Sequence, residues 1–343
     1  MRKILLYLAT ALAVVVALLA FRPAFTPRIA PAGVASLERV TLGGTPQWVL
    51  IRGRSLENPL VLFLHGGPGM PLMYLAHSFQ GDLENDFIVV QWDRRGACKS
   101  YSPDIDPKLI RMSQELADAE QLIDLLGQRF HQAKVIVVGH SYGSRLAIEL
   151  ADRRPDLVRA YVAVGLDACG ETEARTIQDA WLRSEATVAG DAKTLAAINR
   201  GQLWDREAAL FRYGGEVVGF KSFWPLVIKG LLAPEYSLQD AFSVSKGASF
   251  THKHMLYDLL DPGSPLIDSV PRLNVPAFFF TGRADYTTPF SCAERYYDHL
   301  ADPSKHLVWF NHSAHFAFLE EPLRFAEALR EVARETGYSQ LRP

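Results

Sequence analysis

The sequence predicts an α/β fold with a mostly parallel central sheet, and two observations indicate it. First, four continuous apolar runs have the composition of strands buried on both faces, at 60–67, 87–93, 134–141 and 158–165. Second, segments with helical spacing lie between them, as at 112–130, where apolar residues recur every three or four positions. Strands and helices that alternate in this way are typical of a parallel sheet with helices on both faces.

The remaining elements complete this sheet in chain order. Two short runs separated by turn residues, at 38–44 and 47–53, predict an opening antiparallel hairpin. After Leu166 the helical segments become longer and no strand run occurs for about a hundred residues, which predicts an inserted helical lid. Strand runs return at 276–285 and 305–315, and a final helix follows. We therefore expect three folded parts: a first core part at 38–166, a lid at 167–270 and a second core part at 271–338.

The overall composition is that of a globular protein without a charged binding surface. The 343 residues include 36 basic and 38 acidic side chains, which gives a formal charge of −2. Hydrophobic residues make up 48% and charged residues 22% of the chain, enough apolar material for a substantial core. Because no basic excess is present to neutralise phosphates, we do not expect a nucleic-acid partner.

Cysteine and histidine usage predicts neither a disulfide framework nor a metal site. Cys98, Cys169 and Cys292 are odd in number and contain no Cys-x-x-Cys pair, so we expect three free, buried thiols. His252 and His254 have no evident third ligand nearby. No glycine-rich phosphate-loop pattern occurs either. The sequence therefore predicts a protein that needs no metal and no cofactor.

The N-terminus differs from the rest of the chain. Positions 4–21 hold eighteen residues without a charge. A helix of this length spans roughly 27 Å, close to the hydrocarbon core of a bilayer. We expect a signal anchor at 1–22, a Pro- and Ala-rich linker at 23–37, and a membrane-anchored protein whose folded part is exported to the extracytoplasmic side. The alternative is a cleaved signal peptide, which would leave a secreted or periplasmic protein.

Ser141 is the candidate nucleophile. It lies in Gly139-His140-Ser141-Tyr142-Gly143, which matches the Gly-x-Ser-x-Gly pattern. The motif follows four consecutive β-branched residues and precedes a helical pattern, which is the strand-to-helix context of a nucleophile elbow. The helix that begins there also directs the positive end of its dipole at developing negative charge.

A serine hydroxyl needs a general base, and that base needs a carboxylate to orient it. Asp285 and His315 each follow a late apolar run, in the chain order serine, acid, histidine. His312 competes with His315 for the base, and we favour His315 because small residues precede it. For the oxyanion hole we expect the backbone N–H of Tyr142 and that of Gly67, with Gly66 as the reserve for the second donor.

Five motifs together resemble the α/β-hydrolase fold and, within it, the proline iminopeptidase-like branch. They are HGGPG at 65–69, WDRRGACKS at 92–100, GHSYGS at 139–144, GRADYTTP at 282–289 and SAHFAFLEEP at 313–322. The resemblance implies a Ser141–His315–Asp285 triad and a lid whose carboxylates hold the free amino group of a peptide. Glu171 and Glu173, at the start of the lid, are the candidates for that role.

The sequence therefore predicts a serine hydrolase that works through an acyl-enzyme on a small peptide or ester substrate. The favoured prediction is a proline iminopeptidase-like aminopeptidase, and the alternative is an esterase acting on small acyl esters. The residues that depart from those usual in the peptidases are Arg94, Cys98, His140 and Tyr142, which leaves the substrate open. A further alternative from another class is a membrane-tethered binding protein that has lost catalysis.

Overall fold

The computed structural model describes residues 23–29, 31–201, 203–259, 265–302 and 304–338, together with the single residues Lys3, Tyr7, Thr10 and Val14. The predicted signal anchor at 1–22 therefore lies outside the described residues, apart from those four. In the ranges that are described, no helix is both long enough and apolar enough to cross a bilayer.

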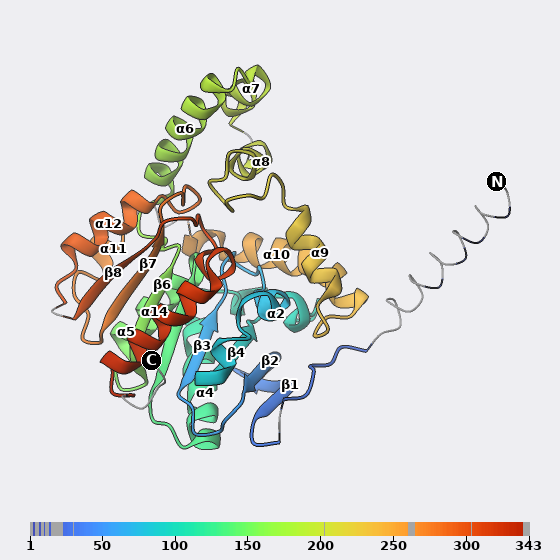
Figure 1. Ribbon diagram of the computed structural model, residues 1–343, viewed down its shortest axis with the longest axis vertical. Coiled ribbons are helices and arrows are strands. Elements are labelled where there is room, and N and C mark those ends of the chain that lie inside the picture. Colours follow the sequence, from blue (N-terminus) through green and yellow to red (C-terminus); the bar gives the residue numbers. More distant parts are fainter. Residues whose placement is uncertain are drawn as a thin grey trace.

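One eight-stranded sheet forms the centre of the molecule, in the order β1-β2-β4-β3-β5-β6-β7-β8 (Figure 1). The strands are β1 Val34–Leu42, β2 Thr45–Gly53, β3 Leu60–Leu64, β4 Ile88–Asp93, β5 Val135–His140, β6 Val158–Val164, β7 Ala277–Gly282 and β8 Lys305–Phe310. Strands β1 and β2 pair antiparallel, β2 pairs antiparallel with β4, and every pair from β4 to β8 is parallel. The predicted mostly parallel α/β sheet is confirmed.

The opening hairpin is longer than its apolar runs indicated. Val34 pairs with Gly53 at the open end of the hairpin, and Leu42 pairs with Thr45 at its turn. Strand β1 thus begins four residues before the predicted start at position 38, inside the stretch that we expected to be linker. The β1 side chains between its ends are partly buried or exposed, and this strand lacks the continuous apolar run that identified the others.

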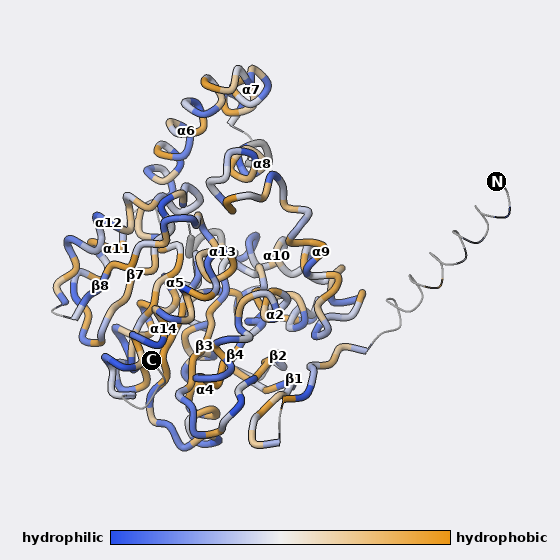
Figure 2. The backbone as a smooth tube through the Cα atoms, viewed as in Figure 1, coloured by the Kyte–Doolittle hydropathy of each residue, from blue (hydrophilic) through white to orange (hydrophobic). Residues whose placement is uncertain are grey.

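Helices cover both faces of the sheet and bury an apolar core on each. The helices of the core are α2 Ala76–Phe79, α3 Leu83–Asp86, α4 Met112–Phe130, α5 Tyr142–Arg153, α12 Phe290–His299, α13 Ala317–Glu320 and α14 Pro322–Glu335, with short 3₁₀ turns η1 Met73–Leu75, η2 Cys98–Ser100 and η3 Pro107–Leu109. Helices α4, α5 and α12 pack on one face. Helices α2, α3, α13 and α14 pack on the other. Apolar residues follow the inner strands throughout (Figure 2).

The regular secondary structure described between β6 and β7 is helical, apart from an isolated β-bridge at Arg272. The helices are α6 Glu171–Val188, α7 Ala192–Arg200, α8 Leu203–Tyr213, α9 Trp224–Leu232, α10 Leu238–Leu259 and α11 Leu266–Ser269. The loop after β4 holds this segment to the core. The hydroxyl of Tyr236 donates to Asp93 Oδ1 at 2.8 Å, and Lys99 Nζ lies 2.8 Å from Asp240 Oδ2. The motif at 92–100 thus fastens the helical segment to the end of β4.

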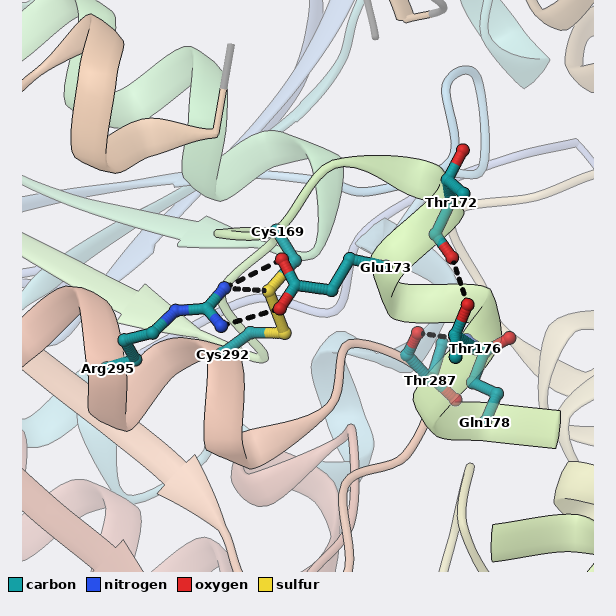
Figure 3. Close-up of a disulfide and its surroundings, with 8 residues drawn as sticks. All are labelled: Cys169, Thr172, Glu173, Thr176, Gln178, Thr287, Cys292 and Arg295. Carbon is teal, nitrogen blue, oxygen red and sulfur yellow. Dashed lines mark hydrogen bonds and ion pairs between the residues drawn. A yellow bond between two sulfur atoms is a disulfide. The ribbon is translucent and has the colours of Figure 1, made fainter. Parts of the chain in front are cut away.

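The expectation of three free thiols is wrong. Cys169 and Cys292 form a disulfide whose Cα atoms lie 5.6 Å apart, although 123 positions separate them in the chain (Figure 3). Cys98 alone is free, and it is buried. A single bridge needs only two cysteines brought within range by the fold, and neither an odd count nor spacing along the chain reveals that proximity. The bridge joins the segment just before α6 to α12.

Candidate active site

Ser141 lies at a sharp turn between β5 and α5. Its backbone has φ 55° and ψ −130°, a conformation that few residues other than glycine adopt. The turn brings the start of α5 very close to β3. A Cβ atom on Gly143 would lie only 2.1 Å from the carbonyl oxygen of Leu64, so this position requires glycine. The Ser141 N–H donates to the carbonyl of Val164 at 3.0 Å, which fixes the turn to the end of β6. A nucleophile elbow requires a sharp strand-to-helix turn of this kind.

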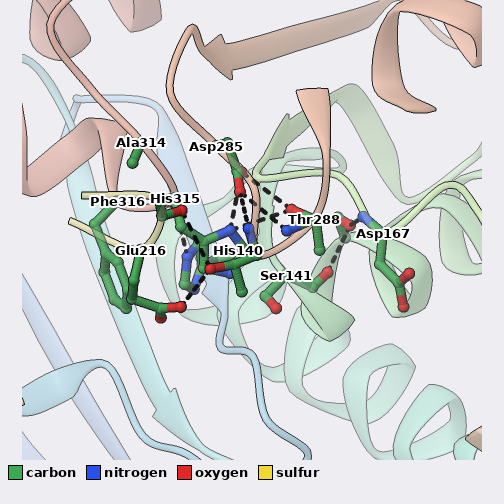
Figure 4. Close-up of polar contacts among 12 residues, drawn as sticks. His140, Ser141, Asp167, Glu216, Asp285, Thr288, Ala314, His315 and Phe316 are labelled. Atoms are coloured by element: carbon green, nitrogen blue, oxygen red, sulfur yellow. Dashed lines mark hydrogen bonds and ion pairs between the residues drawn. The ribbon is translucent and has the colours of Figure 1, made fainter. Parts of the chain in front are cut away.

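His315 and Asp285 form a buried pair beside this elbow (Figure 4). His315 Nδ1 lies 2.9 Å from Asp285 Oδ2. The other carboxylate oxygen, Oδ1, accepts the backbone N–H groups of Thr287 at 3.0 Å and Thr288 at 2.9 Å. The Thr288 hydroxyl lies 3.0 Å from Asp285 Oδ2. Asp285 is thus held in place from several sides while it orients the imidazole.

The order of the strands explains why these residues meet. Ser141 follows β5, Asp285 follows β7 and His315 follows β8, and the carboxyl ends of parallel strands meet at one edge of the sheet. Strand β6 lies between β5 and β7 and ends at Val164, and Gly165 follows it next to the pair. A Cβ atom on Gly165 would lie 2.5 Å from His315 Nδ1 and 3.2 Å from Asp285 Oδ2.

The surroundings of His315 favour its protonated form. Burial lowers the pKa of His315, but the Asp285 carboxylate, with smaller contributions from Glu216 and Glu320, outweighs burial and raises it to about 9. Because Nδ1 faces Asp285, Nε2 is the nitrogen left to exchange a proton with a substrate or nucleophile. The surroundings therefore stabilise an imidazolium at this position.

Two neighbouring glutamates, Glu320 and Glu321, hold the loop that carries His315. The Glu320 carboxylate accepts backbone N–H groups from Ala314 and Phe316, on either side of His315. It also accepts the N–H of Val218, at 2.6 Å. Burial raises the pKa of Glu320 to about 7, and these N–H donors limit the rise. Sequence reasoning missed this anchoring role, although both glutamates lie in the motif at 313–322.

His312, the competing base, lies elsewhere in this loop. Its N–H donates to Glu321 Oε1 at 2.9 Å, and its side chain is exposed. The structure therefore brings His315, and not His312, to Asp285. His140 contributes a second contact between the elbow and His315, because its Nε2 lies 3.0 Å from the carbonyl oxygen of His315. Burial and the nearby positive charge of His315 lower the pKa of His140, which keeps His140 neutral.

The glycine-rich loop after β3 borders the nucleophile. A Cβ atom on Gly66 would lie 2.7 Å from the Cβ of Ser141, so this backbone passes directly alongside it. Gly67 follows, with a cis peptide bond to Pro68. His65 fixes the loop to β4, because its Nε2 accepts the N–H of Arg94 at 3.2 Å. The donors expected for the oxyanion, Tyr142 and Gly67, thus lie on the two segments that flank Ser141.

Arg94, one of the departures from the usual peptidase pattern, is completely buried behind these segments. Its guanidinium carbon lies 5.4 Å from the centre of the Tyr142 ring, and its Nε lies 3.5 Å from Glu115 Oε1. Burial is the largest influence on Glu115 and raises its pKa, while the charge of Arg94 opposes the rise. A buried cation therefore stands next to the residue that follows the nucleophile.

The two lid carboxylates proposed from the sequence form ion pairs with arginines in the structure. Glu171 forms an ion pair with Arg175 one turn further along α6. Glu173 binds Arg295 through both carboxylate oxygens beside the disulfide (Figure 3). All four side chains are exposed to solvent to a large degree. Glu171 and Glu173 act instead as surface ion-pair partners at the base of the helical segment.

Glu216, from the loop between α8 and α9, does reach the site. Its carbonyl oxygen accepts the N–H of His315 at 3.0 Å, and the Thr287 hydroxyl donates to its carboxylate. Burial raises the pKa of Glu216, and the positive charge of His315 partly offsets this. Partial burial and the charge of Glu216 also raise the pKa of Glu207 in α8. No sequence signal distinguishes these two glutamates from others in the segment.

Asp167 is a further carboxylate that the sequence did not single out. It follows β6, and its backbone N–H donates to the Ser144 hydroxyl at 3.2 Å, which in turn donates to the carbonyl of Ser141 at 2.6 Å. Burial raises the pKa of Asp167, and the charges of Arg145 and His315 oppose this rise.

Over the described residues, His, Cys, Asp and Glu side chains form no cluster suited to a metal ion.

Comparison with known proteins agrees with this geometry. The chain matches the Alpha/beta hydrolase family over residues 61–328. It is 31% identical over 310 residues to a "Probable aminopeptidase YbaC" of Bacillus subtilis, covering 88% of this chain and 97% of that protein. It is 23% identical over 301 residues to a "Proline iminopeptidase" of Lactobacillus acidophilus, covering 84% and 94% of the two chains.

A solved structure shows the same fold. The crystal structure of proline iminopeptidase from Mycobacterium smegmatis superposes with a TM-score of 0.64 at 22% identity, covering 89% of this chain and 99% of that one. The extent of the family match, the level of identity to a full-length relative and the architecture agree with one another. The chain therefore belongs to the α/β-hydrolase family of enzymes.

Proposed function

We propose that the protein is a serine hydrolase that works through an acyl-enzyme and that releases N-terminal residues from small peptides, as a proline iminopeptidase-like aminopeptidase. The observation that carries the proposal is the 2.9 Å contact between His315 and Asp285 next to the strained elbow of Ser141. The names of the full-length relatives support the aminopeptidase class.

In the first step, Ser141 Oγ forms a bond to the carbonyl carbon while His315 Nε2 accepts the hydroxyl proton. The carbonyl π electrons move to oxygen, and the N–H groups of Tyr142 and Gly67 bind the resulting oxyanion. The intermediate then collapses, the bond to the leaving amine breaks, and that amine takes the proton from His315. Asp285 stabilises the imidazolium throughout.

In the second step, water replaces the leaving group. His315 accepts a proton from the water, whose oxygen bonds to the acyl carbon, and the ester bond to Ser141 breaks as the proton returns to Oγ. The products are a free carboxylic acid and the regenerated enzyme. No cofactor enters either step.

Glu216 supplies the proposed contact to the substrate's amino group. Its carboxylate is fastened near His315 through Thr287, and Glu207 adds negative charge nearby. A carboxylate that is partly withdrawn from water binds an ammonium group more strongly than an exposed one. Glu216 thus takes the role that the sequence gave to Glu171 and Glu173.

The esterase remains the second candidate function, favoured by the departures at Arg94, Cys98 and Tyr142. A prolyl anilide and a short-chain nitrophenyl ester, assayed side by side, separate the two candidates. The aminopeptidase proposal expects turnover of the anilide, and hydrolysis of the ester alone would overturn it. A binding protein without catalysis would hydrolyse neither substrate.

We also propose that the folded part is exported and anchored by the apolar run at 4–21. The Cys169–Cys292 disulfide supports export, because disulfides persist in oxidising compartments and are rare in the cytosol. N-terminal sequencing of the mature protein tests the anchor. The anchor proposal expects the run to be retained, and a mature N-terminus at Ala13 or beyond would contradict it.

A further inference from the structure

Helix α9 exposes four large apolar side chains on one side. Trp224, Ile228, Leu231 and Leu232 stand at positions i, i+4, i+7 and i+8, which share one face of a helix. Their exposed fractions are 70, 54, 44 and 63%. Single exposed apolar residues are ordinary, but a contiguous set marks a surface that contacts another molecule or a membrane. We call these four residues the outer face of α9.

The opposite side of α9 holds the helix against the core. Leu226 is buried, and a Cβ atom on Gly230 would lie 3.4 Å from the ring of Tyr74. Lys229 Nζ donates to the Ser78 hydroxyl at 3.2 Å, which joins α9 to α2. The helix therefore has apolar residues on both sides, and only one side is buried by packing. Its largely apolar composition is visible in Figure 2.

The outer face lies next to the point where the N-terminal segment joins the body. The Phe25 N–H donates to the carbonyl of Pro234 at 3.0 Å, two residues beyond the end of α9. Buried Arg52 holds the next residues, because its Nη1 donates to Thr26 Oγ1 at 2.5 Å and to the carbonyl of Pro27 at 2.7 Å. Figure 1 shows this segment and α9 on the same side of the molecule.

Chain length keeps the apolar run close to this site. Phe25 is four positions after Phe21, where the run ends. A fully extended chain of four residues spans at most about 14 Å. If the run lies in a bilayer, the surface of that bilayer must therefore come close to the end of α9. Phe25 is itself 49% exposed and extends the apolar surface toward the run.

The charge of this region suits a lipid surface. No Asp or Glu occurs between Glu216 and Glu235, so this stretch carries no acidic side chain that anionic headgroups would repel. Lys221 is exposed and supplies one positive charge there. Trp224 begins the helix, and tryptophan is enriched at the level of the headgroups. Helices of this kind lie in the interface with the apolar face turned toward the acyl chains.

We propose that the outer face of α9, together with Phe25, docks into the lipid surface beside the anchored N-terminal run. The proposal rests on the proposed anchoring, and it adds a second contact that fixes the orientation of the enzyme. The loop that carries Glu216 leads directly into α9, so docking through α9 would also fix the orientation of this loop relative to the membrane.

The experiment places a fluorescent bimane on single new thiols of the full chain in vesicles of mixed zwitterionic and anionic phospholipid. The sites are Ile228→Cys and Leu232→Cys, with Leu125→Cys as the matched control. The exposed fraction of Leu125, 45%, is similar to that of Leu231. Leu125 lies on α4, however, which packs on the sheet face opposite to α2. Cys98 is buried and the other two cysteines form the disulfide, so labelling is confined to the new thiol.

Vesicles that contain brominated lipid give the readout, and flotation reports the anchoring separately. We expect the chain to float and brominated lipid to quench the label at least twofold at positions 228 and 232, with no change at 125. Floating without selective quenching overturns the docking proposal alone. Failure to float overturns the anchoring and the docking with it. A signal at 228 that disappears on dilution of the protein, without lipid quenching, indicates a second copy of the chain and also overturns docking to lipid.

Discussion

Gly165 and His315 are in direct contact, because a Cβ atom on Gly165 would lie 2.5 Å from the Nδ1 atom of His315. The glycine directly follows β6 and has φ +58°, and β6 lies between the strand that leads to Ser141 and the strand that leads to Asp285. The proposed catalytic pair therefore depends on a position that carries no chemistry of its own. This relationship gives a sharp test of the geometry.

Gly165→Ala should displace the imidazole from Asp285. We expect a loss of at least about 100-fold in kcat/KM, because small misplacements of catalytic groups have effects of this size. Gly190→Ala is the matched control, since Gly190 has φ +63° and no atom lies within 4 Å of its Cβ position. Both variants carry a similar backbone cost, roughly 1 kcal/mol. Equal activity losses in the two variants would show that Gly165 has no special relation to His315.

The pH profile should follow His315. Its pKa is raised to about 9, and the base must be neutral to accept a proton, so kcat/KM on a neutral ester, which has no ammonium group that titrates, should rise through a single deprotonation near pH 9. Because the pKa is raised in the folded state, the His315–Asp285 pair also stabilises the folded protein at low pH. That contribution is complete below the unfolded pKa of about 6.5 and is lost as the pH rises through 9. A profile that is already flat by pH 7 would contradict this assignment.

Asp285→Asn should lower both the rate and the pKa of His315. Without the carboxylate, burial dominates and moves the pKa of the imidazole downward. We expect kcat to fall by about four orders of magnitude, since the imidazolium loses its partner. Measuring the pH profile of the residual activity separates this effect from misfolding, because only the electrostatic effect shifts the midpoint below that of the wild type.

Glu216→Gln should separate the two candidate substrates. Loss of a charge-assisted hydrogen bond to the substrate ammonium costs about 1.5–3 kcal/mol, which is roughly 10- to 100-fold in kcat/KM. We expect this loss on a prolyl anilide and less than about a twofold change on a neutral ester. Glu173→Gln is the control, because Glu173 pairs with Arg295 at the surface. Equal losses on both substrates would indicate that Glu216 only supports the His315 loop.

The disulfide predicts a thiol count and a stability change. The denatured, unreduced protein should show one reactive thiol, from Cys98, and three after reduction. Replacing Cys169 and Cys292 together by serine should lower the free energy of unfolding by about 2–4 kcal/mol. Denaturant titration measures this change. Three reactive thiols before reduction would show that the disulfide is absent, and the proposal of export would then lose that support.

Much of the fold and of the proposed triad was predictable because local sequence carries it. Continuous apolar runs identified every strand of the parallel part, and the elbow motif placed Ser141 between β5 and α5. Chain order then placed Asp285 and His315 at neighbouring strand ends. These features depend on periodicity and on residues adjacent in the chain.

The features that sequence reasoning missed depend on contacts between distant residues. Cys169 and Cys292 meet only because α12 packs beside the end of β6, and Glu216 reaches His315 only through the path of the loop after α8. Glu171 and Glu173 fitted the expected role by position, but Arg175 and Arg295 hold them at the surface. Spacing along the chain contains none of this information.

The most direct test of the central claim is labelling by a fluorophosphonate probe, followed by mapping of the modified peptide. An activated Ser141 should attack the phosphorus, so the label should appear on Ser141 and be lost in Ser141→Ala together with hydrolysis. Asp285→Asn should react far more slowly than the wild type. A wild-type protein that stays unlabelled, or a Ser141→Ala variant that retains full hydrolytic activity, would contradict the account.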